Sequence, residues 1–281
     1  MLDAKGIDNN MHPNLLIWLG VVGLLVYFFI GGRRGIRAIT RAFGTSNAMN
    51  AVMAAYRNGD YITALKKTEG LKNGQEKTGE YCFLRGAMLH HLGQLDKSEA
   101  ILREAIPLHD DPRQKALAYN TLASVLMDQR RFPEAVAFYE NAGRAWPDRG
   151  SSLCGIAETW LRQAREFPEA LQCARQAIEI DRRATGMPKE ALDKRLGEDF
   201  AILAWATAAN SGDVREVESL VAKAFSLCGT KTKPILAQIH YHAGKAYETL
   251  KMQEKALDHF RQAMEIDPKG IFGRLADSIA R

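Results

Sequence analysis

Hydrophobic positions follow two different patterns along the chain. Residues 15–30 read LLIWLGVVGLLVYFFI, sixteen positions without a charged side chain. From about residue 45 onward, apolar and small residues recur at helical spacing, and this pattern repeats with a period near 34 residues. An uninterrupted apolar run is typical of a membrane-spanning helix, whereas a repeating amphipathic pattern is typical of stacked helix pairs. The sequence therefore predicts an all-α protein, in which one apolar helix precedes an array of helices.

The apolar run, extended by Gly31 and Gly32, is long enough to cross a membrane. Eighteen helical residues span about 27 Å, which is close to the thickness of the hydrocarbon core of a bilayer. A cleaved signal peptide would have basic residues before the run and small residues after it, whereas here an acidic segment precedes it and Phe-Phe-Ile ends it. We expect a transmembrane helix over 14–32, preceded by a short non-cytoplasmic tail over 1–13.

Basic residues directly after the apolar run indicate its orientation. Lys5 alone precedes the run, and Arg33, Arg34, Arg37 and Arg41 follow it. Because positive residues stay on the cytoplasmic side, we expect a single-pass membrane protein whose C-terminal body faces the cytoplasm. Segment 33–44 is expected to form a basic juxtamembrane helix or linker, whose arginines could also lie on anionic headgroups at the membrane surface. A bacterial inner membrane and an organelle membrane both remain open.

Small residues recur at two positions of the repeat. Numbered from the start of each unit, position 20 is Ala64, Ser98, Ala135, Ala170, Val217 and Ala256 in successive units. Position 27 is Leu71, Ala105, Ala142, Ala177, Ala224 and Ala263. Small side chains let two antiparallel helices approach closely and let the next pair dock, so this spacing predicts a continuous stack of helix pairs.

This pattern, with turns at Gly59-Asp60, Gly93-Gln94 and Gly212-Asp213, resembles the tetratricopeptide repeat (TPR) family. The resemblance implies a right-handed α-solenoid over 45–270, built from about six helix pairs. The expected units cover residues 45–78, 79–112, 116–149, 151–184, 198–231 and 237–270. Position 8 is small in the family, and three units depart from it with Val52, Glu158 and Trp205.

Two further helices are expected within and after this array. The spacing of the units widens between the fourth and the fifth, where apolar residues keep one helical face. We therefore predict one long helix from about Pro188 to Asn210. In segment 271–281, Ile271, Leu275 and Ile279 stand four residues apart, which predicts a capping helix over the last repeat.

The resemblance also implies that the first helix of each pair lines a concave groove. The expected ligand there is a protein partner, bound as an extended peptide or as a helix. Family members that hold a C-terminal carboxylate use Lys and Asn where this chain has Met49 and Met53, so binding of that kind is not expected. The candidate groove residues are Met49, Met53, Tyr56, Phe83, His90, Asn120, Ser124, Met127, Thr159, Arg162, Tyr241 and Lys245.

Charge and motifs argue against enzymatic and nucleic-acid-binding functions. The net charge is +5, but +4 of it lies within 33–44, so the remaining body is too nearly neutral for a nucleic-acid-binding surface. Phosphate-binding loops, zinc-protease motifs and serine-hydrolase motifs do not occur in the sequence. The four cysteines lie too far apart for a zinc knuckle, and neither His90-His91 nor the pair His240 and His242 shares a helix face. We expect no catalytic residue, no cofactor and no metal.

Several functions remain open at this point. The leading one is a non-catalytic, membrane-anchored scaffold or adaptor that gathers protein partners. The order of segments and the junction Gly32-Arg33-Arg34 are similar to the bacterial lipopolysaccharide-assembly regulators with TPR repeats, which implies a regulator of envelope or membrane-protein assembly. That family ends in a cysteine knuckle, which this chain lacks. Mitochondrial import receptors share the expected topology. An RNA-binding helical repeat and an enzyme with an unrecognised site are lesser alternatives, and self-association into a homo-oligomer is left open.

Overall fold

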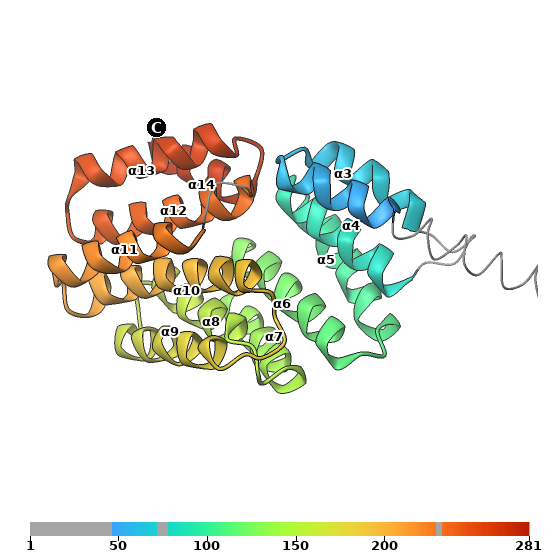
Figure 1. Cartoon of the computed structure of the whole chain (residues 1–281), viewed down its shortest axis with the longest axis horizontal. Helices are drawn as coiled ribbons and strands as arrows, with labels where there is room; N and C mark the ends of the chain where they lie inside the picture. The colour runs from blue at the N-terminus through green and yellow to red at the C-terminus, as the bar shows by residue number, and fades with distance from the viewer. Residues whose placement is uncertain (1–46, 72–77, 229–231, 281) are drawn as a thin grey trace, which may run out of the picture. The chain divides into compact units, whose positions relative to one another are not determined.

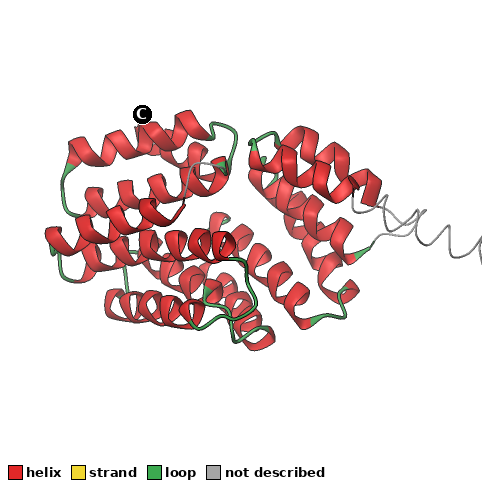
Figure 2. Ribbon diagram, viewed as in Figure 1, coloured by secondary structure: helices red, strands yellow, loops and turns green. Residues whose placement is uncertain are grey.

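The computed structural model describes residues 47–71, 78–228 and 232–280, which form helices joined by short turns (Figures 1 and 2). These three ranges contain no β-strand. Residues from Ala48 onward form one compact unit. None of the helices in these ranges combines the length and hydrophobicity that a membrane crossing requires. The segments expected over 1–13, 14–32 and 33–44, with Arg33, Arg34, Arg37 and Arg41, lie outside the described residues.

The helices follow one another as antiparallel pairs, and consecutive helices pack against each other (Figure 1). The first pair is a helix over residues 47–57 followed by α3, which a single 3-10 turn prolongs to Leu71. The helices from α3 onward are α3 (Tyr61–Lys67), α4 (Gly79–His91), α5 (Leu95–Ala105), α6 (Pro112–Asp128), α7 (Phe132–Ala145), α8 (Ser151–Arg162), α9 (Phe167–Arg182), α10 (Lys189–Asn210), α11 (Val214–Cys228), α12 (Lys233–Thr249), α13 (Gln253–Ile266) and α14 (Ile271–Ala280).

Small residues determine how closely the two helices of a pair approach. A Cβ atom on Gly86 in α4 would lie 2.5 Å from Leu102 Cγ in α5, so no larger residue fits there. Ser98, at position 20 of its unit, donates its hydroxyl to the carbonyl oxygen of Gly86 at 2.7 Å. In the last pair, a Cβ on Gly244 would come within 2.6 Å of the ring of Phe260. The repeated small positions therefore act through direct helix–helix contact, as the sequence pattern predicts.

The long helix predicted between the fourth and fifth pairs is confirmed. Helix α10 covers Lys189–Asn210, with Pro188 as the residue that precedes its first turn. Leu196, Phe200 and Leu203 on its apolar face are all buried. Near its N-terminal end, Arg195 Nη1 donates to Asp181 Oδ1 of α9 at 2.9 Å, and both side chains are buried. This ion pair joins the added turns of α10 to the preceding repeat.

The two ends of the described array contact each other. Tyr61 of α3 donates its hydroxyl to Asp267 Oδ2, across 206 positions of sequence. Arg274 of α14 donates through Nη1 to the carbonyl oxygen of His91 and through Nη2 to that of His90, the latter at 3.5 Å. The His91 ring stacks on Tyr61 with 4.4 Å between ring centroids. Together these contacts form a clasp between the two ends of the array.

Burial, together with the neighbouring His90 and Arg274, lowers the pKa of His91 to about 3. The imidazole in the clasp is therefore neutral at physiological pH. Its stacking on Tyr61 does not depend on an added charge, and the polar part of the clasp consists of the carbonyl contacts of Arg274 and the hydrogen bond from Tyr61 to Asp267.

Replacing Arg274 with alanine removes these carbonyl contacts and should loosen both ends of the array. We expect a loss of about 1 kcal/mol in the free energy of unfolding. Amide hydrogen exchange should become faster in α14 and in the C-terminal turn of α4, because both lose a partner. Exposed Arg261 on α13 supplies the control, Arg261→Ala. Unchanged exchange in α4 of the Arg274 variant would contradict the clasp.

Candidate protein-binding interior

Arg162 of α8 is held between two carboxylates. Its Nη1 donates to Asp128 Oδ1 at 2.7 Å, while Nε and Nη2 donate to Glu158 Oε1 at 2.9 and 2.6 Å. Asp128 Oδ2, at the end of α6, lies 2.7 Å from His90 Nε2 of α4. Glu158 Oε1 also lies 3.4 Å from His242 Nε2 of α12. These five residues, called here the Arg162 network, join the first helices of four repeats.

Charge pairing outweighs burial at both carboxylates of the Arg162 network. Burial alone would raise the pKa of Asp128 and of Glu158, because it removes water from the charged form. Arg162 and the adjoining histidines instead lower both pKa values to about 2. Both carboxylates therefore stabilise the fold above the unfolded pKa values of about 4, and this contribution is lost as the pH falls toward 2.

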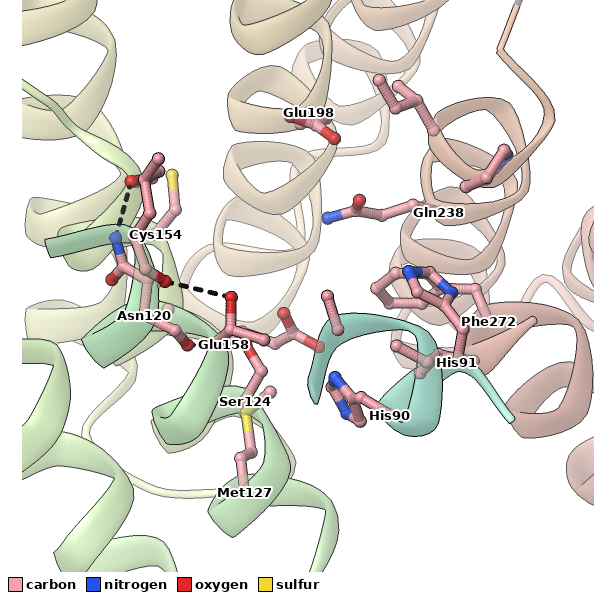
Figure 3. Close-up of a pocket in the computed structure, with 18 of the residues that line it drawn as sticks. His90, His91, Asn120, Ser124, Met127, Cys154, Glu158, Glu198, Gln238 and Phe272 are labelled. Atoms are coloured by element: carbon pink, nitrogen blue, oxygen red, sulfur yellow. Dashed lines mark hydrogen bonds between the residues drawn. The ribbon is translucent and has the colours of Figure 1, made fainter. Parts of the chain in front are cut away.

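A cavity of about 450 Å³ lies on one side of the Arg162 network (Figure 3). It is lined from the helix over 47–57 and from α4, α6, α7, α8, α10, α12 and α14, so it belongs to the interior of the array and not to one repeat. We call it the first cavity. The sequence-predicted groove residues that line it are Met53, Tyr56, Phe83, His90, Asn120, Ser124, Met127 and Arg162.

A second cavity, of about 820 Å³, shares Met127, Asp128, Arg162 and Ile271 with the first. The Arg162 network thus forms part of the wall between them. The predicted groove residues Tyr241 and Lys245 line this second cavity. Lys245 lies over the ring of Trp205, with its Nζ 5.5 Å from the ring centroid.

Two of the predicted groove residues line neither cavity. Met49 packs beside the apolar cluster formed by the first repeats. Thr159 is fully buried, and its hydroxyl donates to the carbonyl oxygen of Gly155 at 2.7 Å within α8. Thr159 also contacts Met127, with 3.3 Å between Oγ1 and Sδ. The repeat register predicts that Met49 and Thr159 face the groove, whereas the structure places neither side chain on a cavity wall.

Several cavity residues were not among the sequence candidates. Glu158 and Asp128 belong to the Arg162 network, and Arg149, Glu198 and Gln238 line the first cavity. Glu198 and Gln238 point into it from α10 and α12 (Figure 3). Glu158 had a signal in the sequence, because a carboxylate stands there at a position that is small in the repeat. The other four carry no such mark.

Two charged groups that line the first cavity form no close ion pair. In the described part of the chain, neither Arg149 nor Glu198 forms an ion pair, and the Arg149 guanidinium donates only to Ser151 Oγ, through Nε at 2.8 Å. Burial raises the pKa of Glu198 to about 7, although Arg149 and Arg195 act against the increase. Half of the Glu198 carboxyls are therefore protonated near neutral pH.

Two buried carboxyl groups, those of Asp181 and Asp199, lie close to Glu198. Asp199 is 2% exposed and accepts a hydrogen bond from Cys154 Sγ at 3.0 Å. Burial and the nearby Asp181 raise the pKa of Asp199 well above its ordinary range. Asp181 meanwhile accepts from Arg195 and from the backbone N–H of Gly150, the latter at 2.8 Å. Burial and Asp181 therefore favour the protonated form of Asp199.

The site contains no constellation that points to metal chemistry. Over the residues that the structure describes, His, Cys, Asp and Glu form no group of three or more that could hold a metal ion. His240 and His259 do meet, with 3.0 Å between their Nδ1 atoms, but Phe225 and Tyr247 flank them instead of acidic ligands.

Two stretches of the chain match family models described as tetratricopeptide repeat, over residues 114–183 and 237–269. The first stretch spans the pairs α6–α7 and α8–α9, and the second lies within α12 and α13 and the residues that follow. These two stretches are therefore similar to tetratricopeptide repeats, and the helices around them follow the same pattern of antiparallel pairs. No curated protein with which the sequence was compared matches it.

Several solved structures are similar to this chain. The TPR protein TTC0263 of Thermus thermophilus is 18% identical, with a TM-score of 0.50 over 72% of this chain and 98% of that one. This likeness shows the fold alone. YrrB, a TPR protein with an unusual peptide-binding site, is 20% identical, with a TM-score of 0.38 over 78% of this chain and 97% of its own. PilF of Pseudomonas aeruginosa is 10% identical, with a TM-score of 0.49 over 85% of this chain and 99% of its own.

Replacing Arg162 with methionine should strongly destabilise the protein. The change leaves Asp128 and Glu158 buried without their cation, which costs about 3–5 kcal/mol of unfolding free energy. Urea denaturation of the full-length protein measures this difference. Arg165→Met, at an exposed position in the turn after α8, removes the same charge and should change stability little. A loss below about 1 kcal/mol for Arg162→Met would contradict the role given to the network.

Replacing Asp199 with asparagine should stabilise the protein at alkaline pH. Since folding raises the pKa of Asp199, the native state loses stability as the pH rises above the unfolded value of about 3.9, by about 1.4 kcal/mol for each unit of pKa difference. Asparagine cannot ionise, so the gain over the parent protein should be larger at pH 8 than at pH 5 in urea denaturation. Exposed Asp148→Asn serves as the control. A gain that does not grow with pH would show that Asp199 is not held neutral.

Proposed function

We propose that this protein is a non-catalytic scaffold or adaptor that binds a segment of a partner protein inside its helical array. The first cavity is the observation on which this proposal rests. Its wall combines half-buried apolar side chains such as Met53 and Phe83 with polar groups that retain free hydrogen-bonding capacity, Asn120 Oδ1 among them. Ligand sites in proteins commonly join an apolar wall with a few convergent polar groups.

The size of the first cavity favours an extended segment over a helix. A helix with its side chains is about 10–12 Å wide, whereas the first cavity has a volume of about 450 Å³. That volume suits a few side chains of an extended segment. Backbone amide and carbonyl groups of such a segment could then pair with Arg149, Glu198 and Gln238.

We also propose that residues 14–32 anchor the protein in a membrane, with the helical body on the cytoplasmic side. The apolar run and the arginines that follow it support this proposal. In that arrangement the scaffold would gather partners at the inner face of a membrane, as a regulator of envelope or membrane-protein assembly would do.

Filling the first cavity should abolish partner binding without unfolding the protein. Gln238→Trp places a large ring in the cavity from α12, where the glutamine side chain is partly exposed. Ile62→Trp is the matched control, because Ile62 is 47% exposed on α3 and lines neither cavity. Full-length proteins in a neutral detergent would be used to capture cross-linked partners, quantified by mass spectrometry. Circular dichroism would establish that both variants remain helical.

We expect the partners of the parent protein to be retained by the Ile62 variant and lost by the Gln238 variant. Partners that bind all three proteins equally would place the interaction elsewhere on the molecule. That result would overturn the proposed site and leave the fold unaffected.

A further inference from the structure

The second cavity differs from the first in charge. Four cationic side chains line it, from the α6–α7 turn, α8, α12 and α14, against one carboxylate, Asp128. The wall of the first cavity instead holds four carboxyl groups against three arginines. The cations of the second cavity are Arg130, Arg162, Lys245 and Arg274.

Two of these cations form no ion pair with a carboxylate in the described part of the chain. Arg162 is paired within its network, and Lys245 is paired with Glu248. Arg274 donates only to backbone carbonyls and forms no ion pair, although Asp128 and Asp267 lie close enough to attract its charge. Arg130 is exposed and forms no ion pair with any residue that the structure describes. The second cavity therefore has a net positive field.

The remaining wall of the second cavity is strongly apolar. Three of its residues, Leu95, Phe132 and Phe167, each lie at the start of the second helix of a repeat. All three are partly exposed. On the opposite element, Leu275 and Ile279 of α14 also line it, and both are only half-buried. A wall of this composition has room to bury bulky apolar side chains of a ligand.

We propose that the second cavity binds an acidic segment of a partner protein that carries bulky apolar side chains. Aspartate and glutamate side chains would face Arg130 and Arg274, and the apolar side chains would contact Phe132, Phe167 and Leu275. Charge complementarity selects the acidic partner, since a basic segment would meet like charges. This inference rests on the proposed function, because it specifies the chemistry of the partner segment that the interior of the array would bind.

The test uses two short synthetic peptides that share the same phenylalanine and leucine positions. One has aspartate and glutamate at every other position, and its counterpart has lysine there. Both carry one dye and are titrated with the full-length protein in neutral detergent, with fluorescence anisotropy as the readout. At about 50 mM salt we expect the acidic peptide to bind about tenfold more tightly than the lysine peptide, and this ratio should shrink at about 500 mM salt.

A charge reversal at Arg130 locates the site. Arg130 has a φ of 61° in the turn before α7, and glutamate at the same position keeps the same backbone strain, so the fold should be unaffected. Arg130→Glu should weaken binding of the acidic peptide by about fivefold or more, and Arg130→Gln should have an intermediate effect. Arg144→Glu makes the same charge change on a side chain that is 69% exposed on α7 and lines neither cavity, and it should have no effect.

Several outcomes would overturn the proposal. These are equal binding of the two peptides, no binding of either, or an equal effect of the Arg130 and Arg144 reversals. Competition by nanodiscs that contain phosphatidylserine would assign the positive field to a lipid surface instead. If Gln238→Trp abolishes partner capture while the acidic peptide fails to bind, only this proposal fails. If neither partner capture nor peptide binding depends on the interior, the proposed function fails as well.

Discussion

The interior of this array depends on the burial of one guanidinium between two carboxylates. Arg162, Asp128 and Glu158 are costly to remove from water, and they are tolerated because each meets an opposite charge at hydrogen-bonding distance. His90 and His242 extend the contact to α4 and α12, so the inner surfaces of non-adjacent repeats are tied directly. In most of the array, repeats contact only their neighbours. Here a polar network fixes the spacing of four first helices and therefore the shapes of both cavities.

Division of the interior gives one scaffold two chemically different surfaces. On one side, burial raises the pKa of Glu198 and of Asp199, which favours their uncharged forms. On the other side, four cationic side chains line the wall against one carboxylate, Asp128. Two segments of one partner, or two partners, could thereby be distinguished by charge.

The sequence predicts the helices much better than it predicts the chemistry between them. Small residues at fixed spacing indicate which helices pair, because contacts such as Gly86 with Leu102 arise within one repeat. The long helix ending at Asn210 follows from an uninterrupted apolar face. Unit register also places Phe83 and Asn120 on a cavity wall, yet it fails to do so for Met49 and Thr159, whose neighbours depend on how successive pairs curve. The two partners of Arg162, which are Asp128 and Glu158, come from two different repeats. The period of the sequence pattern does not indicate which side chains meet between repeats.

The clasp between the two ends of the array has a consequence for how the chain folds. A linear stack of repeats can begin to fold anywhere and extend by nearest-neighbour steps, so its ends fray independently. The contact of Tyr61 with Asp267 instead joins positions 206 residues apart, and it can form only after every intervening pair is in place. Its stabilisation is therefore shared by the whole array. Unfolding should approach a single cooperative transition, and removing either terminal helix should weaken the opposite end as well.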